Sequence, residues 1–183
     1  MSVPDPAPLI LTVALAPQDQ DRFNRLRALH FPAERNYLNA HLTLFHHLPG
    51  DEIVANQAFL ADVARAQAPF RIAAEGLRSL GRGVAFTLAS KKLSLLRSDL
   101  AAEWSHALTN QDRQGFRPHI TIQNKVDPAA ARALLAKLSA NFTPFTVGAI
   151  GLQLWRYRGG PWDQAGTFYF TARPEDPPEH RRQ

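Results

Sequence analysis

Two short segments constrain this chain more than any other feature, because they recur with the same pattern. The first reads His-Leu-Thr-Leu at residues 41–44, and the second reads His-Ile-Thr-Ile at residues 119–122. In a β-strand, residues i and i+2 point to one face, so each segment places its His and Thr on one side and its apolar residues on the other. Each segment is therefore predicted to be a strand with one face on a hydrophobic core and one polar face.

A second pair of segments indicates an internal duplication. Residues 69–77 and residues 144–152 both begin with Pro-Phe, share an Ala in the middle and end with Gly-Leu. Each of them follows one of the His-x-Thr segments in the same order along the chain. Two matches in one order are typical of a repeat, so we expect two lobes related by a pseudo-two-fold axis.

Hydrophobic periodicity gives both halves of the chain the same order of elements: strand, helix, strand, helix, strand. In the first half we expect strands over residues 9–14, 41–46 and 70–80, and helices over residues 18–29 and 52–66. In the second half we expect strands over residues 84–89, 119–123, 145–157 and 167–171, and helices over residues 93–108 and 128–138. The fold class is therefore α+β or α/β, and the family resemblance described below favours α+β. We expect one bilobal domain over residues 9–172, with repeats at about 9–82 and 83–172.

Composition excludes several kinds of protein and site. The chain has no Cys, which rules out disulfides, thiolate metal sites and a Cys nucleophile. No apolar run reaches the roughly 18 residues of a membrane span, and no basic segment precedes the apolar residues 9–16 as in a signal peptide. We expect a cytoplasmic protein without membrane contact. Its ends, residues 1–8 and 173–183, are rich in Pro and are expected to be flexible.

The paired polar faces suit phosphoryl transfer if they meet in one cleft. A neutral imidazole can take a proton from water, and an imidazolium can give a proton to a leaving oxygen. Thr hydroxyls can donate hydrogen bonds to phosphate oxygens as negative charge builds there. The candidate catalytic residues are His41, Thr43, His119 and Thr121. Their surroundings in the sequence look alike, so the assignment of acid and base stays open.

The tandem His-x-Thr-x segments, with hydrophobic x, resemble the motif of the 2H phosphoesterase superfamily and of its 2′–5′ RNA ligase-like (LigT-like) branch. Pro118, directly before the second motif, is also typical of that branch. The resemblance spans about residues 9–171 by order of elements. It implies a bilobal fold with two antiparallel-rich sheets around a central cleft and helices on the outside. The same resemblance identifies His41, Thr43, His119 and Thr121 as catalytic.

This resemblance also implies a function. Members of this superfamily typically open 2′,3′-cyclic phosphates on RNA ends or nucleotides without a metal or other cofactor. Some members also catalyse the reverse reaction, which joins RNA ends through 2′–5′ linkages. The expected partner is therefore RNA with a 2′,3′-cyclic phosphate end, or a cyclic nucleotide, and no obligate protein partner is inferred. The alternative is a module that binds RNA or nucleotides in the same cleft without turnover, which an assay on a cyclic nucleotide distinguishes.

Basic and aromatic side chains outside the motifs are candidates for substrate binding. The chain has 21 Lys and Arg against 16 Asp and Glu, and most of the cations are Arg, whose planar fork suits phosphate. The candidates are Arg82, Arg117, Lys125, Trp155 and Tyr157. Alternation of Trp155 and Tyr157 along a strand is equally compatible with two aromatic residues that cover the core.

Two other patterns are weaker. His41, His46 and His47 suggest a zinc site, but strand alternation separates His46 from His41 and Pro49 ends the strand, so we expect solvated loop histidines and no metal. Residues 76–83 resemble a Walker A loop that has Arg82 at the Lys position and no hydroxyl after it. We expect a simple turn there.

Overall fold

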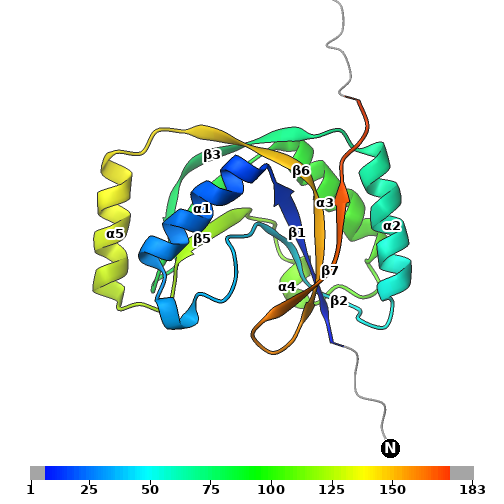
Figure 1. Cartoon of the computed structure of the whole chain (residues 1–183), viewed down its shortest axis with the longest axis horizontal. Coiled ribbons are helices and arrows are strands. Elements are labelled where there is room, and N and C mark those ends of the chain that lie inside the picture. Colours follow the sequence, from blue (N-terminus) through cyan, green and yellow to red (C-terminus); the bar gives the residue numbers. More distant parts are fainter. Residues whose placement is uncertain (1–6, 174–183) are drawn as a thin grey trace, which may run out of the picture.

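The computed structural model describes residues 7–173, and the expected flexible ends fall outside this range except for Ala7, Pro8 and Arg173. Seven strands form one curled antiparallel sheet in the order β2-β1-β6-β3-β4-β5, with β7 paired to β6 (Figure 1). The strands are β1 Leu9–Leu15, β2 Thr43–Leu48, β3 Phe70–Ser79, β4 Val84–Ala89, β5 His119–Gln123, β6 Phe145–Tyr157 and β7 Trp162–Tyr169. The helices are α1 Pro17–His30, α2 Ile53–Ala66, α3 Lys91–Glu103, α4 Asn110–Arg113 and α5 Pro128–Ala140, with a 3₁₀ turn at Ala33–Arg35.

The α+β class is confirmed, but the expected pair of sheets is corrected to a single sheet. Strand β6 is 13 residues long and pairs with β1 over most of its length. Its first residues, from Phe145 to Ala149, also pair with β3, and β7 continues along the same edge from Gly151 onward. The sheet is continuous because this long strand belongs to both halves. Within residues 7–173, no helix has both the length and the apolar character needed to cross a membrane.

The strand order has a two-fold symmetry. When β1 is matched to β4, β2 to β5 and β3 to β6, the order reads the same from either end of the sheet, and the axis passes between β3 and β6. Each half of the sheet therefore contains strands from both repeats: β3 lies with β4 and β5, whereas β6 lies with β1 and β2. The halves of the sheet do not coincide with the two sequence repeats.

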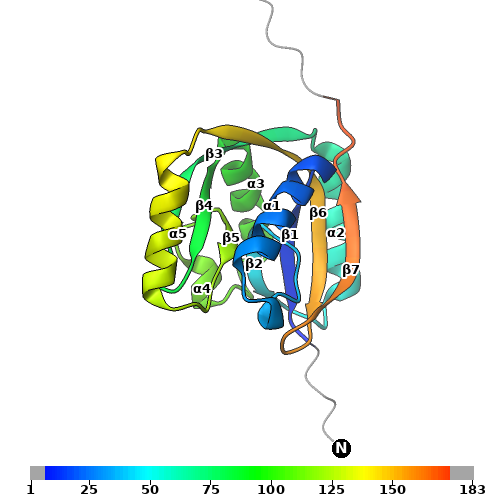
Figure 2. The same cartoon turned by 60° about the vertical axis from the view of Figure 1, so that its left-hand side comes forward.

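The helices cross between the halves in the same way. Phe23 of α1 is fully buried and contacts Phe86 of β4 edge-on, with ring centroids 5.4 Å apart. At the other end of the sheet, Trp104 directly after α3 contacts Phe45 of β2 at 5.1 Å. Helix α5 covers β3 and β4, and α2 covers β6 and β7 (Figures 1 and 2). Each half of the sheet is thus covered by one helix from each repeat.

Most predicted elements are confirmed, although many of their boundaries differ and the short helix α4 was not predicted. Strand β2 begins at Thr43 and α3 ends at Glu103. The last strand begins at Trp162, five residues before its predicted start at Thr167. The Gly-Gly-Pro that precedes Trp162 forms a tight turn, in which the Arg158 N–H donates to the Pro161 carbonyl (3.0 Å). This turn lets β7 pair with β6 from its first residue.

Candidate active site

The two motif histidines lie at equivalent places, at the N-terminal ends of β2 and β5. His119 is the first residue of β5, and His41 lies two residues before β2. The Val13 N–H donates to the Leu42 carbonyl (3.0 Å), so the pairing with β1 extends beyond the start of β2. Leu42 and Ile120 are fully buried on the core side, and the opposite side carries the imidazoles and hydroxyls.

The backbone holds both imidazoles in the same way. His41 Nδ1 lies 2.8 Å from the Asn39 carbonyl oxygen, and His119 Nδ1 lies 2.9 Å from the Arg117 carbonyl oxygen. A carbonyl oxygen can only accept a hydrogen bond, so Nδ1 of each ring carries the hydrogen. Nε2 is therefore the nitrogen of each ring that can accept a proton or, once protonated, donate one.

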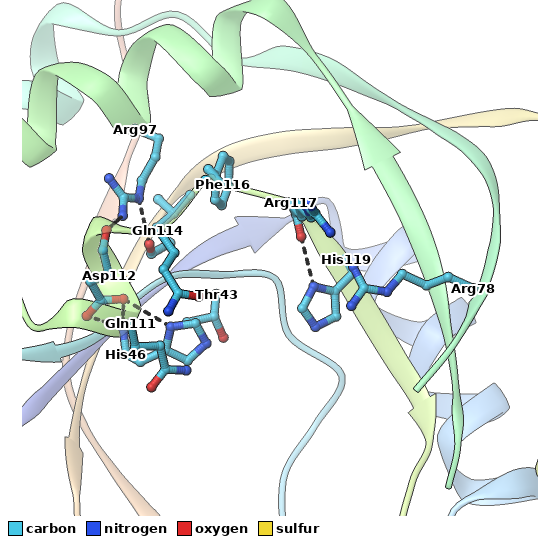
Figure 3. A pocket seen from close by; sticks show the side chains of 12 residues that line it. Thr43, His46, Arg78, Arg97, Gln111, Asp112, Gln114, Phe116, Arg117 and His119 are labelled. Carbon is cyan, nitrogen blue, oxygen red and sulfur yellow. Dashed lines mark hydrogen bonds and ion pairs between the residues drawn. The ribbon is translucent and has the colours of Figure 1, made fainter. Parts of the chain in front are cut away.

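Two cavities each combine one residue from each motif. A cavity of about 670 Å³ is lined by Thr43 and His119 (Figure 3). A second cavity, of about 470 Å³, is lined by His41 and Thr121. The structure thus brings the His of each motif together with the Thr of the other. Together the two cavities contain all four candidate catalytic side chains.

His41 differs from His119 in its surroundings. The ring of Trp162 lies against it, with ring centroids 4.7 Å apart. Burial lowers the pKa of His41 to about 4; the hydrogen bond to Asn39 opposes this shift, and the positive charges of Arg27 and His119 reinforce it. His41 is consequently neutral at neutral pH in the free protein, and its Nε2 lone pair is available to a proton.

Two buried arginines fix the motif strands from helices of the opposite repeat. Arg27 of α1 donates from Nη1 to the Thr121 carbonyl (3.0 Å), and Arg97 of α3 donates from Nε to the Leu44 carbonyl (2.8 Å). Burial lowers the pKa of Arg27 to about 10, so this group still carries its charge at neutral pH. Helix α1 of the first repeat therefore positions the second motif, and helix α3 of the second repeat positions the first motif.

Four of the five candidate substrate-binding residues line these two cavities or a neighbouring one. Arg117 lines the larger cavity together with His119. Lys125 and Tyr157 line the cavity that contains His41. Trp155 lines a neighbouring cavity of about 250 Å³, which His41 also borders.

The fifth candidate, Arg82, lies apart from these three cavities, in the turn between β3 and β4. The Leu80 N–H donates to the Gly83 carbonyl (2.8 Å), and Arg82 donates from Nε to the Val126 carbonyl (3.2 Å). A Cβ at Gly83 would collide with the Gln123 carbonyl oxygen, so glycine is required for this close approach. The predicted turn is confirmed: Gly83 allows the close packing, whereas Gly81 provides the positive φ of 79°.

The larger cavity also contains groups that the sequence did not indicate. Arg78 of β3 reaches it from one side, and His46 lines it from the other (Figure 3). His46 Nδ1 lies 3.0 Å from the carboxylate of the buried Asp112 in α4. His46 and His47 are exposed, as expected, but the expectation that they lie in a loop is wrong, because both belong to β2. Within residues 7–173, no three His, Asp or Glu side chains form a set of metal ligands.

Irregular pairing of β2 explains the position of His46. Leu11 pairs with Phe45 and Thr12 pairs with Thr43, so β2 has one more residue than β1 between Thr43 and Phe45. A second extra residue lies between Phe45 and Leu48, which pairs with Leu9. Such a β-bulge bends the strand and changes the direction of the side chains that follow. Simple alternation would place Thr43 and His46 on opposite faces, whereas both line the larger cavity. For Trp162, the only sequence signal is its place in the aromatic and Arg-rich run at residues 155–162.

Comparisons with known proteins agree with this architecture. A family model described as the 2′-5′ RNA ligase superfamily matches residues 15–161. Among solved structures, TT0787 of Thermus thermophilus is 18% identical with a TM-score of 0.63, covering 89% of this chain and 97% of that chain. E. coli LigT complexed with 3′-AMP is 20% identical with a TM-score of 0.61, covering 91% of this chain and 99% of that chain. At these identities the structural likeness concerns the fold. No curated protein matches the chain.

Proposed function

This chain belongs to the 2′-5′ RNA ligase superfamily, and from that premise we propose that it is a metal-independent phosphodiesterase that opens 2′,3′-cyclic phosphates of RNA ends or nucleotides. One observation carries the proposal: Nδ1 of each motif histidine donates a hydrogen bond to a backbone carbonyl, which leaves Nε2 for proton transfer. Structures of E. coli LigT complexed with 3′-AMP, NADP⁺ and ATP show that this relative binds nucleotides. We extend nucleotide binding to this chain as part of the proposal.

In the proposed reaction, His41 acts as the general base and His119 as the general acid. His41 is assigned as the base because burial keeps it neutral in the free protein. Its Nε2 takes a proton from water as the water oxygen attacks phosphorus. The bond from phosphorus to one ribose oxygen breaks, and His119 gives that oxygen a proton. The products are a phosphomonoester and a free hydroxyl, and solvent returns the proton from His41 to His119.

The two threonines stabilise charge in this scheme. As water adds, negative charge grows on the non-bridging oxygens of the phosphate, and the hydroxyls of Thr43 and Thr121 donate hydrogen bonds to them. Arg117 and Lys125 add positive charge at the two cavities. Formation of a 2′–5′ linkage uses the same groups, with an RNA 5′-hydroxyl in place of water as the attacking group.

The decisive experiment is a hydrolysis assay on 2′,3′-cyclic nucleotides and on an RNA oligonucleotide that ends in a 2′,3′-cyclic phosphate, performed with EDTA. We expect conversion to a phosphomonoester, with mass spectrometry giving the product and chromatography giving its 2′ or 3′ isomer. His41→Ala and His119→Ala should each reduce the rate by at least about 10²-fold. Binding without hydrolysis would favour the alternative of a non-catalytic RNA-binding module, and a rate that returns only with added divalent metal would overturn the metal-independent scheme.

A further inference from the structure

The larger cavity contains more anion-binding groups than the hydrolysis of one phosphate uses. Its volume of about 670 Å³ lies within the range of about 300–1,000 Å³ that is typical of small-molecule sites. Apart from His119, its charged or titratable lining residues are His46, Arg78, Arg97, Arg117 and Asp112. Asp112 is the only acid among the lining residues of this cavity, so the lining as a whole favours an anion.

The single acid of the cavity is fully occupied by hydrogen bonds from β2. Its carboxylate accepts from the backbone N–H of His46 (2.9 and 3.1 Å), from the backbone N–H of His47 (3.0 Å) and from His46 Nδ1 (3.0 Å). The Asp112 side chain is only 1% exposed. Burial alone raises the pKa of Asp112, but these hydrogen bonds outweigh it and lower the pKa. Asp112 therefore stays ionised and orients His46.

The bond to Asp112 determines which nitrogen of His46 is free. A carboxylate can only accept, so Nδ1 of His46 carries the hydrogen and Nε2 has no assigned role in the proposed hydrolysis. The His46 side chain is 46% exposed, although the carboxylate that holds it is buried. In Figure 3 the His46 ring lies near Thr43, on the wall opposite His119 and Arg78. A ring fixed in this way, once protonated at Nε2, donates a directed hydrogen bond to an anion.

We propose that His46, positioned by Asp112, binds a second phosphate of the substrate, on the 5′ side of the nucleoside that carries the cyclic phosphate. This inference rests on the proposed function, because it takes the cyclic phosphate to lie at His119. Two kinds of substrate carry such a phosphate anion on the 5′ oxygen. It is a terminal 5′-phosphate in a mononucleotide and the internucleotide phosphodiester in an RNA end. The site consequently selects substrates that carry a phosphate on both sides of the reacting nucleoside.

The kinetic test compares three substrates that differ only on the 5′ side. They are adenosine 2′,3′-cyclic phosphate, the same compound with a 5′-phosphate, and a dinucleotide that ends in adenosine 2′,3′-cyclic phosphate. We expect wild-type kcat/KM to be about 10- to 100-fold higher for the compounds with a second phosphate, as for a hydrogen bond to a charged group. A preference for the 5′-phosphate alone identifies a mononucleotide substrate, and a preference for the dinucleotide alone identifies an RNA end.

The variant His46→Asn isolates the role of Nε2. An Asn amide can still donate to Asp112 from the position of Nδ1, but it has no nitrogen at the position of Nε2. We expect this variant to lose the preference for the second phosphate, and thermal unfolding will show whether the fold is kept. His47→Asn is the matched control, because the Asp112 bond at His47 comes from the backbone N–H. The control should keep the wild-type preference.

A binding measurement separates this inference from the proposed hydrolysis. Calorimetric titration with adenosine 2′,5′-bisphosphate and with adenosine 2′-monophosphate compares two ligands that require no turnover. A protein that hydrolyses nothing but binds the bisphosphate about 10-fold more tightly, only when His46 is present, would refute the hydrolase and retain the second phosphate site. A protein that hydrolyses all three substrates with equal kcat/KM, or whose preference survives in His46→Asn, would overturn the second phosphate site.

Discussion

At the scale of single residues, the three histidines of the site differ in the group that accepts the hydrogen bond from Nδ1. His41 and His119 give it to backbone carbonyls of residues two positions earlier, and His46 gives it to a carboxylate. A hydrogen bond at Nδ1 fixes the orientation of the ring and leaves Nε2 for chemistry. Three histidines with the same protonated nitrogen can therefore serve different purposes, according to the burial and charge around each ring.

The low pKa of His41 predicts the acid limb of the rate profile. Because kcat/KM reports the free enzyme, we expect it to fall to half its maximum at about pH 4, where His41 becomes protonated. Trp162→Ala should expose the ring and move this limb up toward the ordinary His value of about 6.5. Initial rates between pH 3.5 and 9 measure the shift.

The control for this experiment is Tyr169→Ala, an exposed position at the other end of β7. Its acid limb should coincide with that of the wild type. An acid limb at the same pH in the wild type and in Trp162→Ala would show that burial of His41 does not set it. Tryptophan fluorescence at the lowest pH should confirm that the protein is still folded.

The hydroxyls of Thr43 and Thr121 predict a graded loss of activity. Thr121→Val keeps the shape of the side chain and removes one donor to a charged oxygen, so we expect kcat to fall by about 10- to 100-fold. His119→Ala removes a proton donor and should cost at least about as much, within the 10²–10⁴-fold range of general acid catalysis. Thr121→Ser keeps the hydroxyl and should lie closer to the wild type. Equal rates for the Val and Ser variants would assign Thr121 to packing.

At the scale of elements, the short helix α4 is held against β2 by the hydrogen bonds that Asp112 accepts. This carboxylate accepts three donor groups of β2, and Arg97 of α3 donates to the Asp112 carbonyl (2.6 Å) and also to the Leu44 carbonyl. The bulged part of β2 lacks regular partners on β1 in this interval, so these side-chain contacts replace ladder hydrogen bonds. Helix α4 thereby fixes the strand that carries the first motif.

Asp112→Asn should lower the free energy of unfolding by about 1–3 kcal/mol, because the NH2 group that replaces one carboxylate oxygen cannot accept from the N–H donors of β2. The pH dependence has a definite sign. The pKa of Asp112 is lower in the folded protein than its ordinary value of 3.8, so its stabilisation is complete above that value and is lost as the pH falls through the folded pKa. Urea unfolding at neutral pH and in acid should show a large difference between variant and wild type only at neutral pH.

A matched control is available in the exposed pair of Arg158 and Asp163, whose Nε–Oδ2 distance is 2.7 Å. Asp163→Asn should change the free energy of unfolding by less than about 1 kcal/mol, as for surface ion pairs. A stability change of the same size in both variants would indicate that the hydrogen bonds of Asp112 add nothing beyond an ordinary surface charge.

The elements could be predicted from the sequence where the pattern is local, and not where it depends on pairing. The strand over residues 84–89 is confirmed to the residue, because it is a short apolar run bounded by Gly83 and by Ser90, the N-cap of α3. The place of His46 could not be predicted, since a bulge depends on the register between β2 and β1. The bonds from Arg27 and Arg97 to the opposite repeat depend on how the halves interlace, which no local pattern contains. The two motif strands were predictable because their apolar residues had to face a core.

At the scale of the whole molecule, the continuous sheet and the crossed helices join both halves into one structural unit. Strand β6 pairs with β1 and β3, and α1 of the first repeat covers strands of the second. Each half of the sheet is covered by one helix from each repeat. The two halves should therefore unfold together.

The distribution of tryptophans allows a direct test of this cooperativity. Trp104, Trp155 and Trp162, the three tryptophans of the chain, all lie in the half that contains β1, β2, β6 and β7. Phe23 is fully buried against Phe86 in the other half. Phe23→Ala should lower the free energy of unfolding by about 3–5 kcal/mol, and tryptophan fluorescence should report the whole shift.

Circular dichroism provides the second probe for this test. Its urea transition should coincide with that of tryptophan fluorescence in both the wild type and Phe23→Ala. A fluorescence transition that stays at the wild-type urea concentration, while circular dichroism shows an earlier step, would mean that the halves unfold independently.

The interlaced halves have a consequence for how such a molecule can arise. A single repeat on its own would leave the apolar face of α1, with Phe23, uncovered, because the strands that α1 covers belong to the other repeat. Such a fragment could bury that face only against a second copy, in a closed and self-complementary pair that exchanges elements. Tandem fusion turns this encounter into an intramolecular one, independent of protein concentration. Fusion also allows the two repeats to diverge in sequence, as the surroundings of His41, which lies against Trp162, and of its counterpart His119 already have.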